Sequence, residues 1–474
     1  MGSISKRVAV IGAGVSGLTT ARHLIDSGIE VVVFERSATA GGIWSYDERQ
    51  PLEPRYPSVV PSIADFVKEE EEKLVGLSEE ELKLRHAPPG PAYDGLKNNI
   101  STVLQELKGY PWKKGTEDFV NVRVIGDYLQ SFSQNFGVEP LIKYHTRVEK
   151  VTKQGARWLV QSTTLAPDGR GKVEDSDLYD GVVVASGHYH ACRVPDIPGL
   201  KEWKSTWPDR VQHSKKYRRP DEFQGKNVLL IGAGVSSTDI GREISGLANR
   251  VYQSSRGGLF DLPEAFLPPN VRRVGAVSHF SAPSTIEGDN SPPSIFLKDG
   301  EELVGIDKVI IATGYHITYP FLRDLHDDLA TSDTTDETVL VTDGTQVHNL
   351  HKDIFYIPDP TLAFVGVPYY VATFTLFEFQ AIAIAAVISG RAQLPPTEEL
   401  RTEYRKKLQE KGSGRPFHSL KDEEVEYVDS LVEWLNRDAA KSGGSRVEGH
   451  SAAWHAENEF KMEKIKQIAE SFNQ

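Results

Sequence analysis

Cysteine is almost absent from this sequence: Cys192 is the only one in 474 residues. A single cysteine excludes an intramolecular disulfide, a Cys-x-x-Cys redox pair and a cysteine-rich metal site. No other metal-binding cluster stands out, so we expect no metal. The opening residues pass directly into an apolar strand, without the features of a signal peptide. These absences favour a reducing compartment, and we expect a cytoplasmic protein.

Positive charge is also scarce. The 54 Lys and Arg residues are outnumbered by 67 Asp and Glu residues, which leaves a formal net charge of −13. An acidic surface repels phosphate backbones, and no basic stripe is long enough to reverse that repulsion, so we expect no nucleic-acid partner. The hydrophobic share of 39 % is enough to build folded cores, and the length predicts two or three domains.

One long stretch is nearly free of charge, from Thr361 to Gly390, where Glu378 is the only formally charged residue. Its length could cross a bilayer. However, Gly366 and Pro368 interrupt it, and its first part has the pattern of a strand and its second part that of a helix. We therefore predict a buried strand–helix unit and no membrane partner.

A dinucleotide-binding pattern opens the chain. An apolar run of strand length at residues 8–11 is followed by a glycine-rich turn, a helical pattern at 18–25 and a second apolar strand at 31–34. In this context, glycines permit a tight turn and let the backbone approach a pyrophosphate at the helix N-terminus, and an acid after the second strand accepts hydrogen bonds from a ribose. The predicted site consists of Gly12, Ala13, Gly14, Val15, Ser16, Gly17, Glu35 and Arg36.

The pattern recurs between residues 227 and 256, but its second strand ends without an acid. Hydroxyl groups and the guanidinium of Arg256 suit a 2′-phosphate, which a carboxylate would repel. Such a contact is worth about 1.5–3 kcal/mol, a roughly tenfold to hundredfold preference. The alternative is that Arg256 is an ordinary solvated arginine. The predicted NADPH site consists of Gly232, Gly234, Val235, Ser236, Ser237, Ser254, Ser255 and Arg256.

Each of the two dinucleotide-binding patterns ends with a similar sequence motif, at residues 180–187 and 307–314. Both motifs predict buried strands that end in small residues, which lets the backbone come near a cofactor. The fold class is therefore α/β with two Rossmann-like dinucleotide-binding domains, and two such folds suggest two cofactors that exchange a hydride.

Several motifs resemble those of the flavin-containing monooxygenases, a group of class B flavoprotein monooxygenases. Residues 41–44 match the family's Gly-Gly-x-Trp. His213 and Tyr217 match the pattern Phe-x-Gly-x-x-x-His-x-x-x-Tyr/Phe, whereas Trp207 and Asp209 depart from it, which puts the turn of the interdomain linker in doubt.

The phrase at residues 354–366 looks like that of soluble fungal members. The resemblance spans about residues 6–390 and thins between 51 and 92. It implies that FAD binds an outer domain made of residues 1–204 and 326–474, and that NADPH binds an inserted domain at 205–325. It also implies FAD contacts from Gly42, Ile43, Trp44, Asn98, Asn99 and Gln380, and an NADPH contact from Tyr217. For Gln380, capping of the buried helix is an equal alternative.

One side chain takes a catalytic role by this resemblance. Residues 93–99 are similar to the family's Tyr-x-x-Leu-x-Thr-Asn, whose last asparagine touches flavin, NADP⁺ and the peroxy group. Asn99 occupies that position, and an amide can donate and accept hydrogen bonds at once. The alternative is a loop asparagine that makes turn contacts, which the neighbouring Asn98 favours.

The family's reaction reduces FAD with NADPH, forms a C4a-hydroperoxyflavin with dioxygen, and passes one oxygen to a soft nucleophile. We therefore expect a small-molecule amine or thioether and dioxygen as partners, with a homodimer as the working expectation for the assembly. Three alternatives stay open: a Baeyer–Villiger monooxygenase, a non-catalytic flavin/NADPH-binding redox sensor, and an NADPH oxidase that makes only peroxide. His188 and His190 are expected to be hydrogen-bonded loop histidines.

Overall fold

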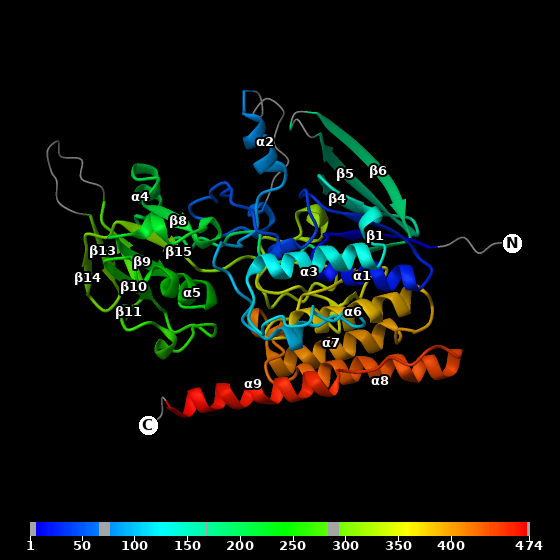
Figure 1. Cartoon of the computed structure of the whole chain (residues 1–474). Coiled ribbons are helices and arrows are strands. Elements are labelled where there is room, and N and C mark those ends of the chain that lie inside the picture. The colour runs from blue at the N-terminus through cyan, green and yellow to red at the C-terminus, as the bar shows by residue number, and fades with distance from the viewer. Residues whose placement is uncertain (1–5, 66–75, 167–168, 170, 283–292, 472–474) are drawn as a thin grey trace.

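The computed structural model describes residues 6–65, 76–166, 169, 171–282 and 293–471. These residues form two lobes, which stand side by side in Figure 1. We refer to residues 6–192 and 317–471 as the outer lobe and to residues 193–316 as the inserted lobe, because Val194 packs in a core of the second and Ile317 against a core of the first.

The outer lobe is built on a seven-stranded sheet in the order β16-β17-β18-β7-β1-β2-β3. The strands from β18 to β3 pair in parallel, and β16 and β17 are antiparallel additions at one edge. The strands are β1 (Arg7–Ile11), β2 (Glu30–Phe34), β3 (Ile142–Lys143), β7 (Gly181–Val184), β16 (Leu350–His351), β17 (Phe355–Tyr356) and β18 (Leu362–Phe364).

The outer lobe has two hydrophobic cores, one on each face of the sheet, and successive side chains of β1 point alternately into them. Val8 and Val10 face one core, which is filled by helices, and Ala9 and Ile11 face the other. The second core lies under an antiparallel sheet of β4 (Thr146–Gln154), β5 (Arg157–Leu165) and β6 (Lys172–Tyr179). The helices of this lobe are α1 (Val15–Asp26), α2 (Glu79–His86), α3 (Val122–Asn135), α6 (Thr373–Ile388), α7 (Thr397–Lys411), α8 (Glu424–Ser442) and α9 (Ala452–Ser471), and α8 and α9 form the lower edge in Figure 1.

The inserted lobe, like the outer lobe, has a central sheet with helix on one face and an antiparallel sheet on the other. Its five-stranded sheet has the order β11-β10-β9-β15-β8, and every pair in it is parallel. Helix α5 (Val235–Ile244) covers one face, and α4 (Leu200–Thr206) with a three-stranded antiparallel sheet covers the other. The strands are β8 (Val211–His213), β9 (Asn227–Ile231), β10 (Arg250–Ser254), β11 (Val271–Val274), β15 (Lys308–Ile311) and, in the smaller sheet, β12 (Val277–Phe280), β13 (Ser294–Leu297) and β14 (Glu302–Val304).

The predicted α/β class with two Rossmann-like units is therefore confirmed. The packing differs from the predicted boundaries at both crossings. Trp203 lies in the core of the inserted lobe, ahead of residue 205, and Phe321 lies in a core of the outer lobe, before residue 326. Apolar side chains occur on both sides of each crossing, so composition gave no sharp signal for the change of core.

The uncharged stretch from Thr361 to Gly390 forms strand β18 and helix α6, as predicted. Glu378 within it is buried, where its carboxylate accepts from the Lys108 backbone N–H at 2.7 Å and pairs with Arg22 at 3.2 Å. Within the described residues, no helix is both long and apolar enough to cross a membrane.

Candidate functional site

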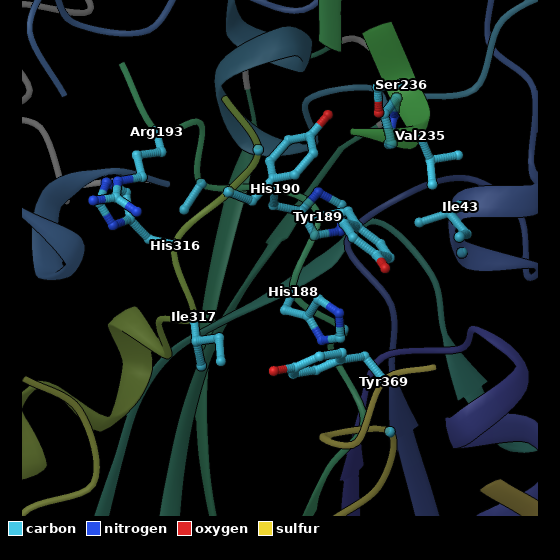
Figure 2. Close-up of a pocket in the computed structure, with 18 of the residues that line it drawn as sticks. Ile43, His188, Tyr189, His190, Arg193, Val235, Ser236, His316, Ile317 and Tyr369 are labelled. Atoms are coloured by element: carbon cyan, nitrogen blue, oxygen red, sulfur yellow. The ribbon is translucent and has the colours of Figure 1, made fainter. Parts of the chain in front are cut away.

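A cavity of about 2690 Å³ lies between the lobes and is lined by residues of both. Sites for single drug-sized ligands measure about 300–1,000 Å³. The cavity therefore has room for more than one extended ligand. Figure 2 shows part of its wall, where residues of both lobes point toward one another.

The first glycine turn follows β1. Gly12 has φ +104°, and a Cβ there would stand 2.6 Å from the carbonyl oxygen of Ala185, just after β7. A Cβ at Gly17 would stand 1.8 Å from the Gly12 carbonyl oxygen, so helix α1 lies directly against the turn. Helix α1 begins at Val15 with no side chain capping its N–H groups and no acid in its first turn. Free N–H groups and a positive dipole end make this turn a ready anion site.

Two further segments back this turn. The Gly-Gly-x-Trp phrase forms a 3-10 helix, η1 (Gly42–Trp44), and a Cβ at Gly42 would stand 2.9 Å from the Cα of Gly14. A Cβ at Gly366 would stand 2.9 Å from the hydroxyl of Ser16. Only glycines let these segments approach so closely, and the result is a wall of backbone packed against the start of α1.

The acid after β2 is held in place beside the same turn. Glu35 is buried, and one carboxylate oxygen accepts from the Ala13 N–H at 2.8 Å. The other accepts from the N–H and the hydroxyl of Ser37, at 2.8 and 2.6 Å. A carboxylate has about four lone-pair positions, so Glu35 keeps capacity to accept from a ribose hydroxyl. Arg36, beside it, pairs with Asp65 at 3.3 Å.

The second glycine turn repeats the first. Gly232 has φ +116°, and a Cβ there would stand 2.4 Å from the carbonyl oxygen of Ala312, after β15. Helix α5 begins at Val235 without a side-chain cap. Ser237 stands in place of the third glycine, and its hydroxyl donates to the Gly234 carbonyl at 3.1 Å. A small residue other than glycine is therefore accommodated at this position.

The residues after β10 divide into two groups. The Ser254 hydroxyl donates to the Gly275 carbonyl at 2.9 Å, and the Ser255 hydroxyl donates to the carboxylate of Asp261. Arg256 lines the cavity and is exposed. In the described part of the chain no carboxylate forms an ion pair with Arg256, so its guanidinium is available to a ligand phosphate.

The two adjacent asparagines have different positions. Asn98 is buried, its amide NH₂ donates to the carbonyls of Ile100 and Asp118 at 2.7 and 2.8 Å, and its amide oxygen accepts from the Val120 N–H at 2.6 Å. Asn99 is exposed and lines the cavity. Asn98 thus fixes the loop that presents Asn99, and its own side chain is used within the protein.

Gln380 and Tyr217 also lie away from the cavity wall. The Gln380 side chain accepts from the Gly366 N–H and donates to the Tyr427 hydroxyl, both at 2.9 Å, so it supports the Gly366 loop. Tyr217 is fully buried in the inserted lobe and donates to Glu243 at 2.6 Å. The cofactor contacts expected of these two side chains therefore have no support from their positions.

The structure brings most of the predicted residues to the cavity wall. The predicted residues that do not line it are Ala13, Gly17, Asn98, Ser237, Ser255, Gln380 and Tyr217, and those that line it are Gly12, Gly14, Val15, Ser16, Glu35, Arg36, Gly42, Ile43, Trp44, Asn99, Gly232, Gly234, Val235, Ser236, Ser254 and Arg256.

An aromatic wall, which the motifs did not reveal as a group, joins the two glycine turns. His188 and Tyr189 follow β7, Tyr315 follows β15, and Tyr369 comes from the loop before α6 (Figure 2 labels all but Tyr315). Burial lowers the pKa of His188 to about 4 and raises the pKa of Tyr369 well above its usual range, which keeps it a neutral phenol. The sequence signal for this wall was the small residues that follow β7 and β15. The side chains that come after those small residues are therefore expected near a cofactor.

His190 and Cys192 stand close to this wall. Burial holds the pKa of His190 well below its usual range, so the ring is neutral. Burial raises the pKa of Cys192 to about 11, which keeps it a thiol. Among the described residues, no group of three or more His, Cys, Asp or Glu side chains could hold a metal ion.

Comparison with known proteins agrees with this geometry. The family model described as FMO-like, flavin-binding monooxygenase-like, matches residues 5–67, 89–266 and 275–442. The flavin-containing monooxygenase ustF2 of Aspergillus flavus is 44% identical over 97% of this chain and 98% of its own length. The flavin-containing monooxygenase iboF of Amanita muscaria is 32% identical over 93% of this chain and 90% of its own.

Solved structures have the same architecture. The S-allyl-L-cysteine S-oxygenase of Allium sativum superposes with a TM-score of 0.70 at 27% identity and covers 99% of this chain and 95% of its own. A steroid monooxygenase bound to NADP shares the fold, with a TM-score of 0.57 at 14% identity over 93% of this chain and 98% of its own. With a family model that spans most of its length and relatives matched end to end, the chain is an oxidoreductase that belongs to the flavin-binding monooxygenase-like family.

Proposed function

We propose that the protein uses FAD and NADPH to place one oxygen atom of dioxygen on a nucleophilic nitrogen or sulfur of a small molecule. The reaction consumes NADPH, a proton, dioxygen and the substrate, and it forms NADP⁺, water and the oxygenated substrate. The observation that carries this proposal is that two uncapped glycine turns and Asn99 line the same cavity.

The outer lobe fits FAD. The uncapped start of α1 would bind the diphosphate, and Glu35 would accept from the adenosine ribose. The start of α1 is backed by the backbone at Gly42 and Gly366, where a Cβ at either glycine would stand 2.9 Å from Gly14 or Ser16. When bound there, FAD supplies the redox chemistry that links a hydride donor to dioxygen.

The inserted lobe fits NADPH. The uncapped start of α5 would bind its diphosphate, and Arg256 would bind the 2′-phosphate. Val235, an apolar side chain that is 53% exposed, faces the cavity at this point and would be covered by the nucleotide.

Asn99 is the chain's own group at the reacting centre. Its amide would donate to the oxygen being transferred and accept from the nicotinamide carboxamide. The neutral aromatic wall would limit the access of water to the reacting centre, which would protect the oxygenating state from wasteful loss of peroxide. Because an amine or thioether attacks with its own lone pair, no general base is required, and the lowered pKa of His188 agrees with that.

The choice of nitrogen or sulfur follows the chemistry of a soft nucleophile. The name of the Allium sativum relative records oxygenation at sulfur in that enzyme. A homodimer and a cytoplasmic location stay predictions, which sedimentation of the pure protein and imaging of a tagged chain would test.

The direct test is anaerobic reduction by NADPH, followed by dioxygen and absorbance recording. We expect bleaching of the flavin by NADPH, and then a long-lived species that is neither reduced nor oxidised flavin and that decays faster when an amine or thioether is added. Instant return to oxidised flavin would count against the proposal.

Product analysis separates the alternatives. Baeyer–Villiger enzymes carry Trp-Pro after the fingerprint histidine, where this chain has Tyr217 and Arg218, so we expect no esters from ketones. A redox sensor would show no oxygen-dependent NADPH consumption, and an oxidase would release one peroxide per NADPH with every substrate offered.

A further inference from the structure

Three arginines from distant parts of the chain line the cavity near the second glycine turn. Arg256 follows β10, Arg193 lies in the crossover after β7, and Arg415 begins the 3-10 helix η10 (Arg415–His418) of the outer lobe. We refer to them as the arginine triad. The sequence motifs pointed to Arg256 alone.

Arg193 is fixed where the chain crosses between lobes. Its N–H donates to the Gly314 carbonyl at 2.9 Å, and its carbonyl accepts from the Thr313 hydroxyl at 2.5 Å. Figure 2 shows its side chain beside His316 at the cavity wall. The backbone is thus held against the turn after β15, and only the guanidinium has freedom to meet a ligand.

Arg415 reaches from the outer lobe to the inserted lobe. Its guanidinium carbon lies 5.4 Å from the ring centroid of Phe260. The Phe260 carbonyl oxygen lies 3.6 Å from where a Cβ of Gly234 would stand, and the next segment is anchored by a Leu262 N–H that donates to Ala233 at 2.8 Å. Arg415 therefore stands beside the turn that would bind the NADPH diphosphate.

The triad carries more positive charge than the described residues neutralise. No carboxylate in the described ranges forms an ion pair with any of the three, and Asp343 is the acid that acts on Arg193 and Arg415 from a distance. Burial, and then the like charge of the other arginines, lowers the pKa of both Arg193 and Arg415. The Nε of Arg415 is buried and has no hydrogen-bond partner among the described groups. Gathered cations with an unused donor are costly unless an anion joins them.

We propose that Arg193, Arg256 and Arg415 together hold the phosphate charge of NADPH, so that the outer lobe takes part in nicotinamide-nucleotide recognition. The inference rests on the proposed NADPH site. Phosphate oxygens accept paired hydrogen bonds from guanidinium groups, and three arginines from three segments surround such a group better than one does. Nucleotide binding would then also draw the two lobes together.

The test measures binding without turnover. FAD-loaded, oxidised enzyme is titrated in a calorimeter with NADP⁺ and, separately, with NAD⁺. We expect Arg415→Gln and Arg193→Gln each to weaken NADP⁺ binding roughly tenfold to a hundredfold. Arg415→Lys, which keeps the charge, should lose less. Arg437→Gln is the matched control, because Arg437 is 65% exposed on α8 and pairs only loosely with Asp438, at 3.8 Å.

The two nucleotides distinguish which phosphate is bound. A loss confined to NADP⁺ assigns the triad to the 2′-phosphate, and an equal loss on NAD⁺ assigns it to the diphosphate; either supports the proposal. NADP⁺ affinity of Arg415→Gln equal to that of the Arg437→Gln control would overturn it. If Arg415→Gln did not retain FAD, Arg193→Gln would decide by the same criterion. Wild-type holoenzyme that bound no NADP⁺ would instead refute the proposed NADPH site itself.

Discussion

The two lobes of this protein repeat one plan in different surroundings. In each, a central strand has the second strand on one side and the closing strand on the other, in the orders β2-β1-β7 and β10-β9-β15. In each, a helix follows the glycine turn, and an antiparallel sheet of three strands comes before the closing strand. The carbonyl of an alanine, Ala185 or Ala312, fixes the first glycine from the same direction. The repeat explains why one chain offers two similar nucleotide turns.

The surroundings of the two turns differ. Val15 and Val235 hold the same place, the first residue of the helix, yet Val15 is 9% exposed and Val235 is 53% exposed. Both turns line the cavity, but the outer turn is packed against the loops at Gly42 and Gly366, whereas Val235 of the inserted turn is left exposed. We infer that the enclosed turn retains its cofactor through many turnovers and that the open turn exchanges its nucleotide in each one.

Matched alanine substitutions at the first glycines test this difference with the largest expected effect. Gly12→Ala places a Cβ at a positive φ and against a carbonyl, a strain of about 1–3 kcal/mol before the clash is counted. We expect colourless protein with a melting temperature lower by several degrees. Gly232→Ala should stay yellow and lose NADP⁺ binding.

Gly137→Ala is the control for these two variants, because Gly137 has φ +67° but open space around its missing Cβ. It should cost stability without cofactor loss. Absorbance at purification, calorimetry and thermal melts report all three variants. If Gly12→Ala retained full flavin, the close contact with Ala185 would not be what shapes the site.

Substitutions at the two adjacent asparagines should have the next largest effect. They distinguish a residue that acts in the reaction from one that only holds the loop. Asn99→Ala should retain FAD and NADP⁺ but convert consumed NADPH mainly into peroxide, with product yield lower by roughly a hundredfold, as when a single transition-state donor is removed. Asn98→Ala removes buried hydrogen bonds and should lower the melting temperature. Peroxide per NADPH and product yield are the measurements. Unchanged yield in Asn99→Ala would remove this residue from its role.

The polar residues after the second strands of the two lobes should show a smaller, selective effect. Arg256→Gln should raise the Michaelis constant for NADPH tenfold or more and leave that for NADH nearly unchanged, because only NADPH carries the 2′-phosphate. Glu35→Gln should weaken FAD by about tenfold, the worth of one charged hydrogen bond. Equal effects of Arg256→Gln on NADPH and NADH would contradict a 2′-phosphate contact, although not a diphosphate contact.

Local rules were enough to predict the two glycine turns. Each turn is a short stretch in which strand, glycines and helix are consecutive, so the sequence around Gly12 and Gly232 contains the whole motif. The acid at Glu35 and the arginine at Arg256 follow from the same spacing. The alternatives that stayed open were those that depend on orientation: whether Asn98 or Asn99 faces the cavity is determined by hydrogen bonds to residues 118–120, which are remote in sequence.

The aromatic wall and the arginine triad could not be predicted in that way. Tyr189, Tyr315 and Tyr369 come from three loops, and Arg193 and Arg415 are separated by 222 residues of the chain. Apart from the small residues that end the closing strands ahead of Tyr189 and Tyr315, nothing in their local sequence marks them, because their role arises only when both crossings bring the lobes together. The same reason accounts for the shifted boundaries, since Trp203 belongs to the lobe against which it packs.

The segment of residues 93–99 belongs to one lobe and contacts the other. A substitution in it should give the smallest effect that we expect. The segment belongs to the outer lobe by sequence and presents Asn99, yet the Tyr93 hydroxyl donates to Asp239 on α5, and the Tyr93 ring packs edge-on against Tyr217 at 5.3 Å. The inserted lobe thus holds the loop that presents Asn99, so a shift of that lobe would move this residue.

Tyr93→Phe removes this tie while it keeps the ring. One hydrogen bond is worth about 0.5–1.5 kcal/mol, so peroxide release should rise a few-fold while FAD and NADP⁺ affinities stay within twofold. Tyr144→Phe is the matched control: it removes a similar phenol–carboxylate bond, to Glu139 at 3.0 Å, within the outer lobe, and should leave the coupling of NADPH use to product formation unchanged. If both variants released peroxide equally, the tie to α5 would only stabilise the fold. A rise in Tyr93→Phe alone would mean that the position of Asn99 depends on the lobe that we propose binds NADPH, so that nucleotide binding and oxygen transfer would be mechanically linked through one tyrosine.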